Sequence, residues 1–570
     1  MYKMMRKFWL GLTVVLSLAV YSRASAQNPI TVSKVIHEGK SSYVEANGQP
    51  YLMYGIQMRM DNYLDLYGST APIFQYFEKA SSAGFRDVIL PLSWMRFETT
   101  DNVFTYAYVD SVLVNAHKYN LRIQLMWFGS NVCAYSELPW YINNDVVNYP
   151  KISATPWAPV VYSNPKLIEK EVRAVKSLMN YINIHDTEKR IVMIQVENEP
   201  NHKGPLVDYW AGAQEVATKH MLDTLGKVIH ASNSNMVTRV NLIGGYYDTT
   251  ALKAIKGIDL FGSDLYMDDL ANYTTYLAKL DYVSQVNHTP ENGGHYTNGI
   301  NLASAAFERG DGYLLYEIRT TGKKWLDMYD LGFFVGTLAN DWVQRPFYND
   351  TKTFNDMIYK ADKKIARCSK GNIASFNQAN SATTVSETKS IGKYSVAYSS
   401  SNGGEAIALV DELGDIVLLS HNDNSTFSIT TLASGVVASI GKFDDQNQWQ
   451  ETKTVTIVNH SITLMAGEVA RIYDPLLTGL AESNKFEAVL ELYPNPTSGD
   501  VLLTLAAEQD ANAVITVFDL LGQKMMVENA KLVSGQNQIP LSIQTLPNGI
   551  YVVQVGACGV SSSLYLVVVK

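Results

Sequence analysis

The feature that most constrains the fold is an alternation of strand-like and helix-like segments between Tyr51 and Arg319. Short apolar runs rich in β-branched residues are separated by amphipathic stretches with helical periodicity. The runs cover residues 51–57, 87–92, 121–127, 191–197, 240–245, 258–266, 284–290 and 312–317, and the seventh has the weakest pattern. Eight strands in regular alternation with helices predict an α/β fold, the (β/α)8 or TIM barrel.

The rest of the chain predicts two β-rich domains. After Cys368, short alternating runs are separated by Gly, Asn, Asp and Ser, which is typical of a β-sandwich. A further set of short strands with Pro, Asn and Gly turns predicts a second, small β-sandwich. Because 570 residues are too many for one ordinary domain, we place the barrel at 27–367, the first sandwich at 368–478 and the second at 487–570.

The first 26 residues have the layout of a secretory signal peptide. A basic start precedes an apolar run from Phe8 to Val20, and Ala-Ser-Ala precedes Gln27. The run is too short to cross a bilayer comfortably. We therefore expect an exported protein with a signal peptide at 1–26, an uncleaved anchor being the alternative.

Cysteine spacing and charge exclude several classes of function. The three cysteines lie far apart, without a disulfide framework or metal-ligand spacing. The net charge of −9 leaves no basic patch for nucleic acid. We expect neither a metal nor another cofactor, and the sequence carries no signal for oligomeric state.

Carboxylates that follow the predicted strands are the candidates for chemistry, because active sites of such barrels form at the carboxyl ends of the strands. Glu197 and Glu199 follow the fourth run, Glu291 the seventh, and Glu317 ends the eighth. Two carboxylates flanking a glycosidic bond can act as nucleophile and as acid/base in retaining hydrolysis. Alternation along a strand gives Glu197 and Glu199 one shared face, with Asn198 opposite, so it does not choose between them.

The segment "MIQVENEPN" (193–201) resembles the fourth-strand motif of clan A glycoside hydrolases, most closely the β-galactosidase-like proteins of families 35 and 42. Residues 85–110 and 121–142 resemble the second and third strands of the same families, and the resemblance extends over roughly residues 45–350. It implies that Glu199 is the general acid/base and that Asn198 binds the 2-hydroxyl of the substrate. Glu197 would then be a structural carboxylate, tied to Arg59 after the first strand.

The nucleophile has two candidates. The families place it at the end of the seventh strand, which the segment "VNHTPENGGHYTNG" (286–299) resembles, and this favours Glu291. If the weak seventh run is a loop, "GYLLYE" (312–317) becomes the seventh strand and Glu317 takes the role. The resemblance also matches Tyr266 to the aromatic residue that contacts the nucleophile.

Four further side chains are candidates for substrate binding. Trp94 and Trp127 would either stack on sugar rings or pack inside the barrel. Asn131, in the loop after the third strand, and Arg59 could bind hydroxyl groups.

The last block carries three motifs in order, "LYPNPTSGDVLLTL", "AVITVFDLLGQKM" and "LPNGIYVVQV", before the terminal Lys570. Together they resemble a type IX secretion system C-terminal sorting domain. The resemblance implies the secretion machinery as a partner and a secreted or cell-surface location. A carbohydrate-binding sandwich is the alternative.

The sequence thus predicts a secreted retaining exo-β-glycosidase, β-galactosidase-like, that removes terminal sugars from an oligosaccharide or polysaccharide. The first alternative is the same mechanism on a glucoside, arabinoside, mannoside or uronide. The second is a surface glycan-binding protein that keeps the barrel without catalysis. The third places ligand binding in the middle sandwich, with the barrel as its scaffold.

Overall fold

The computed structural model divides into two compact units. The first comprises residues 1–412, 417–430 and 463–469, and the second residues 413–416, 431–462 and 470–570. The structure describes residues 33–38, 41–60, 73–133, 136–153, 158–202, 211–243, 252–266, 269–280, 288–292, 296–320, 333–336, 338, 340–376, 385–401, 405–430, 432–433, 435–475, 491–507, 511–519, 523–557 and 560–570. The predicted signal peptide lies outside these ranges.

Eight strands of the first unit close into a barrel with the order β10-β11-β12-β13-β4-β5-β8-β9. Every neighbouring pair is parallel. The strands are β4 (Tyr54–Gln57), β5 (Asp87–Ser93), β8 (Arg122–Val132), β9 (Ile191–Asn198), β10 (Val237–Ile243), β11 (Leu260–Asp264), β12 (His288–Asn292) and β13 (Gly312–Leu315). Each overlaps one of the eight predicted runs, the weak seventh included.

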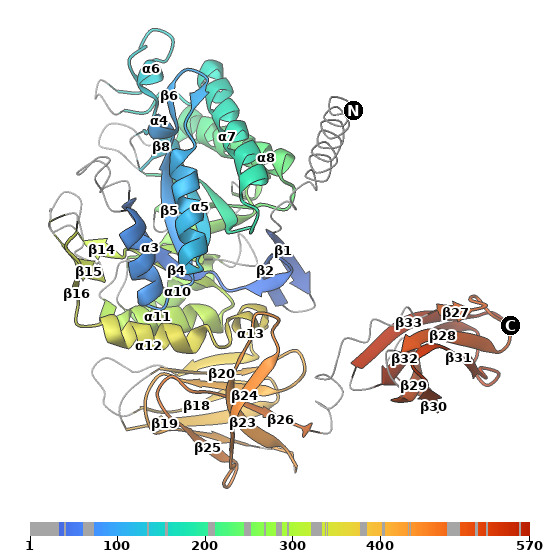
Figure 1. Cartoon of the computed structure of the whole chain (residues 1–570). Helices are drawn as coiled ribbons and strands as arrows, with labels where there is room; N and C mark the ends of the chain where they lie inside the picture. The colour runs from blue at the N-terminus through green and yellow to red at the C-terminus, as the bar shows by residue number, and fades with distance from the viewer. Residues whose placement is uncertain are drawn as a thin grey trace, which may run out of the picture. The chain divides into compact units, whose positions relative to one another are not determined.

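Helices follow the strands and cover the barrel (Figure 1). The 21-residue helix α7 (Pro165–His185) shows why the sequence forms them. Asn164 caps it by accepting a hydrogen bond from the Lys166 N–H (2.9 Å), and Pro165 is its first residue. Leu167, Ala174 and Leu178 lie on its buried stripe. The other helices in the described ranges are α3 (Ile73–Ser82), α4 (Trp94–Phe97), α5 (Ala107–Tyr119), α6 (Trp140–Asn143), α8 (Gly212–Ser232), α10 (Leu270–Leu280), α11 (Tyr296–Glu308), α12 (Tyr348–Ile358) and α13 (Asp362–Arg367).

The first unit also contains small sheets outside the barrel. A three-stranded antiparallel sheet precedes β4, and its Val44 and Tyr51 pack with Met193 and Val237 in one core cluster. The small-sheet strands are β1 (Ser33–Glu38), β2 (Ser41–Ala46), β3 (Gln49–Tyr51), β6 (Glu98–Thr100), β7 (Val103–Phe104), β14 (Arg319–Thr320), β15 (Phe334–Val335) and β16 (Val343–Gln344).

The chain after α13 is β-rich. In the first unit, β17 pairs antiparallel with β20, and β19 pairs antiparallel with both β18 and β22. In the second unit, β23 pairs antiparallel with β24 and β26. The bounds are β17 (Ile373–Phe376), β18 (Val385–Ile391), β19 (Tyr394–Ser400), β20 (Ala406–Val410), β21 (Ile416–Ser420), β22 (Ser425–Ile429), β23 (Val437–Phe443), β24 (Trp449–Val455), β25 (Ser461–Leu464) and β26 (Val469–Tyr473).

The C-terminal part of the second unit is a small sandwich. One sheet has the order β27-β28-β31 and the other β30-β29-β32-β33. Alternating residues such as Leu503, Leu505, Val517 and Val553 meet in one core. The strands are β27 (Glu491–Tyr493), β28 (Val501–Ala507), β29 (Ala511–Asp519), β30 (Lys524–Leu532), β31 (Gly535–Leu541), β32 (Gly549–Ala557) and β33 (Val560–Val568).

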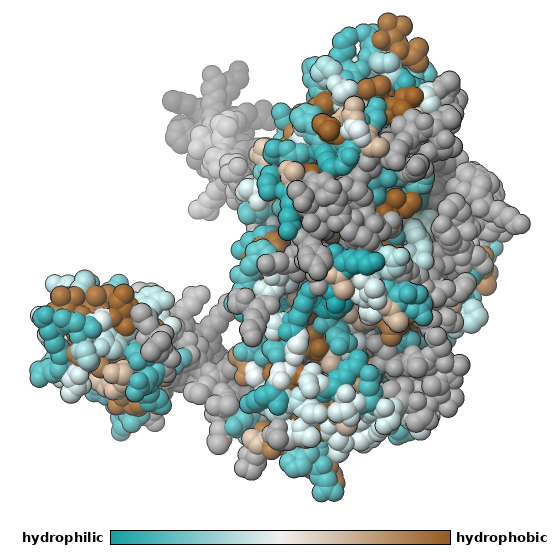
Figure 2. Space-filling view, turned by 180° about the vertical axis from the view of Figure 1, so that it is seen from behind, coloured by the Kyte–Doolittle hydropathy of each residue, from teal (hydrophilic) through white to brown (hydrophobic). Residues whose placement is uncertain are grey.

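This domain also shows apolar surface, visible as brown atoms in Figure 2. Its exposed apolar side chains include Val514, Val527, Ile550 and Tyr565. The prediction of a mixed α/β chain with a parallel sheet followed by β-rich domains is confirmed. The boundaries at 368, 478 and 487 stay predictions. In the described part of the chain, no helix is long and apolar enough to cross a membrane.

His421 makes a pH-sensitive contact inside the first unit. Its buried imidazole hydrogen-bonds through Nδ1 to Glu405 Oε2 (2.8 Å) and through Nε2 to the carbonyl oxygen of Asp350 in α12 (3.0 Å). Burial lowers the pKa of His421, but the hydrogen bond and charge of Glu405 and the charge of Asp350 outweigh it, so the pKa is raised. The folded chain therefore favours the protonated imidazole.

We expect the stabilisation from His421 to be complete below the unfolded-state pKa of about 6.5 and to be lost as pH rises through the folded-state pKa. The free energy of unfolding of the wild type should fall more steeply above about pH 6.5 than that of His421→Gln. Denaturant titrations at several pH values measure this. His117→Gln, which alters an exposed His–Glu pair, should follow the wild type, and parallel curves for His421→Gln would rule out the effect.

Candidate active site

The fourth barrel strand, β9, ends in a left-handed backbone conformation that residues other than glycine rarely adopt. All its residues are buried, as expected for a strand covered on both faces. At its carboxyl end, Glu197 has φ +60° and Glu199 has φ +46°. A left-handed conformation costs a residue with a side chain roughly 1 kcal/mol. Two such residues around Asn198 therefore need surrounding contacts that hold them.

Contacts from the third strand, β8, hold Glu197. Its carboxylate accepts hydrogen bonds from the N–H groups of Ser130 (2.8 Å) and Gly129 (3.3 Å). Cys133 N–H donates to the carbonyl oxygen of Asn198 (2.8 Å). A Cβ on Gly129 would lie 2.0 Å from Glu171 Oε1 and 2.8 Å from Glu197 Oε1, so a larger residue there would displace both carboxylates.

Glu197 is thus 1% exposed and bonded to backbone, which suits the structural role that the sequence favoured. The predicted tie to Arg59 stays a prediction; the Arg59 guanidinium lies 5.8 Å from the Phe128 ring centroid.

Contacts from its own strand and from the fifth strand, β10, hold Asn198. Its Oδ1 accepts hydrogen bonds from Gln195 Nε2 (3.0 Å) and from Asn241 Nδ2 (2.7 Å). Asn241 Nδ2 also donates to Asp264 Oδ2 (2.9 Å), and Asn241 Oδ1 accepts from the N–H of Glu199 (3.2 Å). Asn198, Glu199 and Asp264 are 7%, 7% and 3% exposed. Hydrogen bonds therefore hold the Asn198 side chain in a largely buried site, beside Glu199 and Asp264.

The Glu199 carboxylate accepts no hydrogen bond from any residue that the structure describes. Its backbone, in contrast, is fixed at both ends, since the carbonyl oxygen accepts from His202 N–H (2.9 Å) as well. A carboxyl group that is positioned by its backbone and has no described partner is available to exchange a proton with a bound molecule.

The strand order decides which candidate nucleophile lies on the seventh strand. Glu291 is the fourth residue of β12, which pairs with β11 and β13 and is interrupted by an irregularity between Thr289 and Asn292. Glu317 lies two residues beyond β13, the eighth strand, and is 3% exposed. The condition under which Glu317 would replace Glu291, that residues 312–317 form the seventh strand, is not met. The Glu291 side chain lies outside the described structure.

The other predicted residues lie in different environments. Tyr266 follows β11, with its ring edge-on to Tyr316 at a centroid distance of 6.4 Å. Trp94 and Trp127 are 0% and 1% exposed, and their indole N–H groups donate to the buried carboxylates of Glu98 (2.8 Å) and Glu171 (2.9 Å).

This burial favours the packing role for both tryptophans over stacking on sugar. Asn131 lies in β8, and its side chain is outside the described structure.

Sequence reasoning missed Gln195, Asn241 and Asp264. Each is a polar residue that is buried within a barrel strand. A polar residue in a buried strand needs a hydrogen-bond partner, so its position in such a strand was the sequence signal for a polar network. Among the described residues, no three His, Cys, Asp or Glu side chains are grouped to hold a metal ion.

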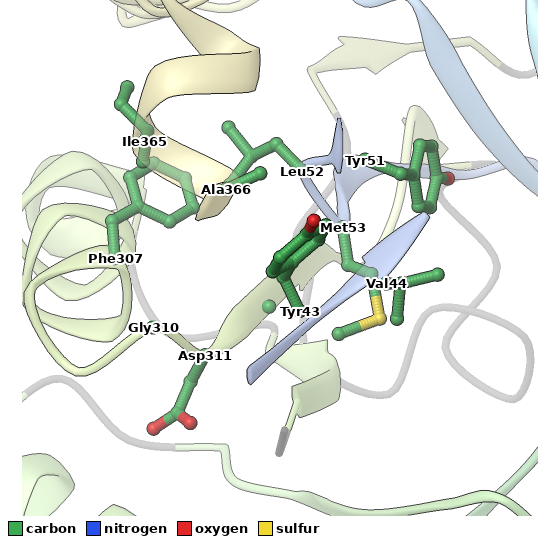
Figure 3. Close-up of a pocket in the computed structure, with 11 residues that line it drawn as sticks. Tyr43, Val44, Tyr51, Leu52, Met53, Phe307, Gly310, Asp311, Ile365 and Ala366 are labelled. Carbon is green, nitrogen blue, oxygen red and sulfur yellow. The ribbon is translucent and has the colours of Figure 1, made fainter. Parts of the chain in front are cut away.

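Two cavities lie away from the residues at the end of β9. One, shown in Figure 3, lies beside the amino ends of β4 and β13 and is lined by Tyr43, Met53 and Asp311. Its volume of about 10 Å³ holds about one water molecule. The other, about 320 Å³, is lined mainly by apolar side chains of β5, α4 and α5. Neither is lined by Glu199 or Asn198.

Comparison with known proteins identifies the C-terminal part of the chain. Residues 491–569 match the family model of the secretion system C-terminal sorting domain. The predicted sorting domain is confirmed, and it supports export to the cell surface or the medium. No curated protein matches the chain.

Several solved structures have a remote likeness to the chain. An exo-β-1,4-mannosidase from Opitutaceae bacterium strain TAV5 is 13% identical, with a TM-score of 0.44 over 58% of this chain and 63% of its own. A family 39 glycoside hydrolase from Bacteroides cellulosilyticus WH2 is 13% identical, with a TM-score of 0.40 over 78% of this chain and 87% of its own. A β-galactosidase from Marinomonas ef1 is 10% identical, with a TM-score of 0.42 over 56% of this chain and 63% of its own.

The chain thus spans less than two thirds of the length of the mannosidase and the β-galactosidase. At these identities and TM-scores the likenesses assign no function, and the resemblance to families 35 and 42 stays a prediction.

Proposed function

We propose that the protein is a secreted retaining β-glycosidase that uses Glu199 as acid/base and Glu291 as nucleophile. The observation that carries the proposal is the end of β9, where Asn198 and Glu199 are fixed by contacts from both neighbouring strands while the Glu199 carboxylate keeps no described partner. Glu291 lies on the seventh strand, at the same end of the parallel barrel. The sorting domain supports secretion.

The mechanism is a double displacement. Glu291 attacks the anomeric carbon while the protonated Glu199 gives its proton to the glycosidic oxygen, so that the leaving sugar departs as an alcohol. Glu199, now a carboxylate, then removes a proton from a water molecule that attacks the covalent glycosyl-enzyme and releases Glu291. Such a mechanism requires the two carboxyl groups about 5–5.5 Å apart.

Asn198 would contribute a hydrogen-bond donor. Its Oδ1 already accepts two hydrogen bonds, so the amide can serve a substrate only through its Nδ2 group. An N–H donor suits the oxygen of a sugar hydroxyl, and the resemblance assigns the 2-hydroxyl.

The proposal is tested by hydrolysis of nitrophenyl β-glycosides with galactose, glucose, arabinose, mannose and glucuronic acid. We expect turnover of the galactoside, with the other sugars as alternatives of the same mechanism. Glu291→Gln should lose the activity, and turnover by Glu199→Gln should fall because no base activates the water of the second step. Glu78→Gln, on the exposed side of α3, should retain the activity. Sugar binding without turnover would instead support a glycan-binding protein.

A further inference from the structure

The buried amide of Asn241 connects the two residues at the end of β9 to the sixth strand. We propose that Asn241 is a positioning residue that sets which end of the Asn198 amide faces the substrate. This inference rests on the proposed function, because it concerns the contact between Asn198 and a sugar hydroxyl. Asn241 itself is 0% exposed and lies in β10, beside β9.

Two groups of fixed chemistry determine the orientation of Asn241. The backbone N–H of Glu199 can only donate, so the atom of Asn241 that it contacts at 3.2 Å must be the carbonyl oxygen Oδ1. The Asp264 carboxylate accepts, so the atom of Asn241 at 2.9 Å from it must be the amino nitrogen Nδ2. The two contacts require the same orientation of the Asn241 amide. A reversed amide would place Nδ2 against the N–H of Glu199 and Oδ1 against the Asp264 carboxylate.

The orientation of the Asn241 amide in turn determines the orientation of the Asn198 amide. Because Asn241 Nδ2 also lies 2.7 Å from the Asn198 amide, the atom facing it must be an acceptor, the oxygen Oδ1. Gln195 Nε2 donates to the same oxygen (3.0 Å), and its own identity is fixed by the carbonyl oxygen of Glu197 (2.9 Å). The Nδ2 group of Asn198 is thereby turned away from the network.

Only asparagine meets these requirements at position 241. The position needs an acceptor for Glu199 and Gln195 and a donor for Asn198 and Asp264, all within the length of one short side chain. Aspartate has the same shape but no donor, and leucine has neither group. Because the site is buried, water does not easily replace the missing group.

The test compares substrates with and without a 2-hydroxyl. In Asn241→Asp, a carboxylate oxygen would face Asn198 Oδ1, and reversal of the Asn198 amide would relieve the repulsion while presenting an acceptor to the sugar. We expect kcat/KM for a nitrophenyl β-glycoside to fall roughly 10- to 100-fold, and for its 2-deoxy counterpart several-fold less. The preference for the 2-hydroxyl should therefore shrink.

Asn201→Asp is the matched control. Asn201 is another buried amide of the same segment, and within the described ranges it bonds only the backbone of Ile243 (3.1 and 2.8 Å). This variant should lower stability without changing the ratio of the two substrates. Asn241→Ala, which introduces no buried charge, serves where Asn241→Asp does not fold, and it should reduce the ratio in the same direction.

Three outcomes are distinguished. A reduced ratio in the Asn241 variants with an unchanged ratio in Asn201→Asp supports the inference. Active Asn241 variants with the wild-type ratio overturn it and leave the proposed function intact. A wild type that turns over no β-glycoside in the panel overturns the proposed function, and the inference with it.

Discussion

Replacing Glu199 with glutamine is expected to lower kcat/KM for a β-linked disaccharide about 10²- to 10⁴-fold, the usual contribution of a general acid. Glutamine keeps the size of the side chain but cannot transfer a proton to the leaving oxygen. An alkoxide leaving group needs that proton, whereas a dinitrophenolate leaves without it. The loss in the first chemical step should therefore be much smaller for a dinitrophenyl glycoside.

Pre-steady-state release of dinitrophenol, compared with disaccharide hydrolysis, measures this difference. Glu291→Gln is the variant for comparison, because loss of the nucleophile should abolish both reactions regardless of the leaving group. If Glu199→Gln lost both activities equally, or neither, the role of Glu199 as acid would be wrong.

The largest effect on stability is expected from Asp87→Ala. Asp87 is fully buried at the start of β5 and accepts two hydrogen bonds from Arg122, through Nε (2.8 Å) and through a terminal nitrogen (2.7 Å). Removing the carboxylate leaves the Arg122 guanidinium, whose side chain is 26% exposed, without its bidentate partner; Asp362 lies 3.9 Å away and the Tyr51 ring centroid 4.7 Å away. We expect the free energy of unfolding to fall by roughly 3 kcal/mol, as for other broken buried ion pairs.

Chemical denaturation measures the loss. Asp356→Ala, which removes an exposed pair with Lys352 on one helix, should cost about 0.3–0.5 kcal/mol. Equal effects of the two substitutions would show that the Asp87–Arg122 pair contributes no more than a surface ion pair.

The barrel strands could be predicted because each is a short apolar run between amphipathic segments. The seventh is the instructive one, since β12 has only five residues and an irregular register with β13. β12 forms because it pairs with β11 and β13. Pairing with neighbouring strands does not require a strand-like pattern in the sequence of β12 itself. The prediction of a strand there depended on the count of eight.

The alternation of side chains along a strand could not predict the structure at the end of β9. Alternation gave Glu197 and Glu199 the same face, but both have left-handed backbone conformations, so the rule for an extended strand does not apply to them. What separates them is tertiary: β8 provides donors for Glu197, and β10 provides an acceptor for the backbone of Glu199. The burial of Trp127 likewise depends on Glu171, which is distant in sequence.

The central claim is tested most directly by trapping the covalent intermediate. A 2-deoxy-2-fluoro β-glycoside with a good leaving group would form a long-lived glycosyl-enzyme, because the fluorine destabilises the positively charged transition state of its hydrolysis. Mass spectrometry of the digested protein then locates the sugar. The account predicts one sugar on Glu291, whereas a sugar on Glu317, or turnover without any covalent adduct, would contradict it.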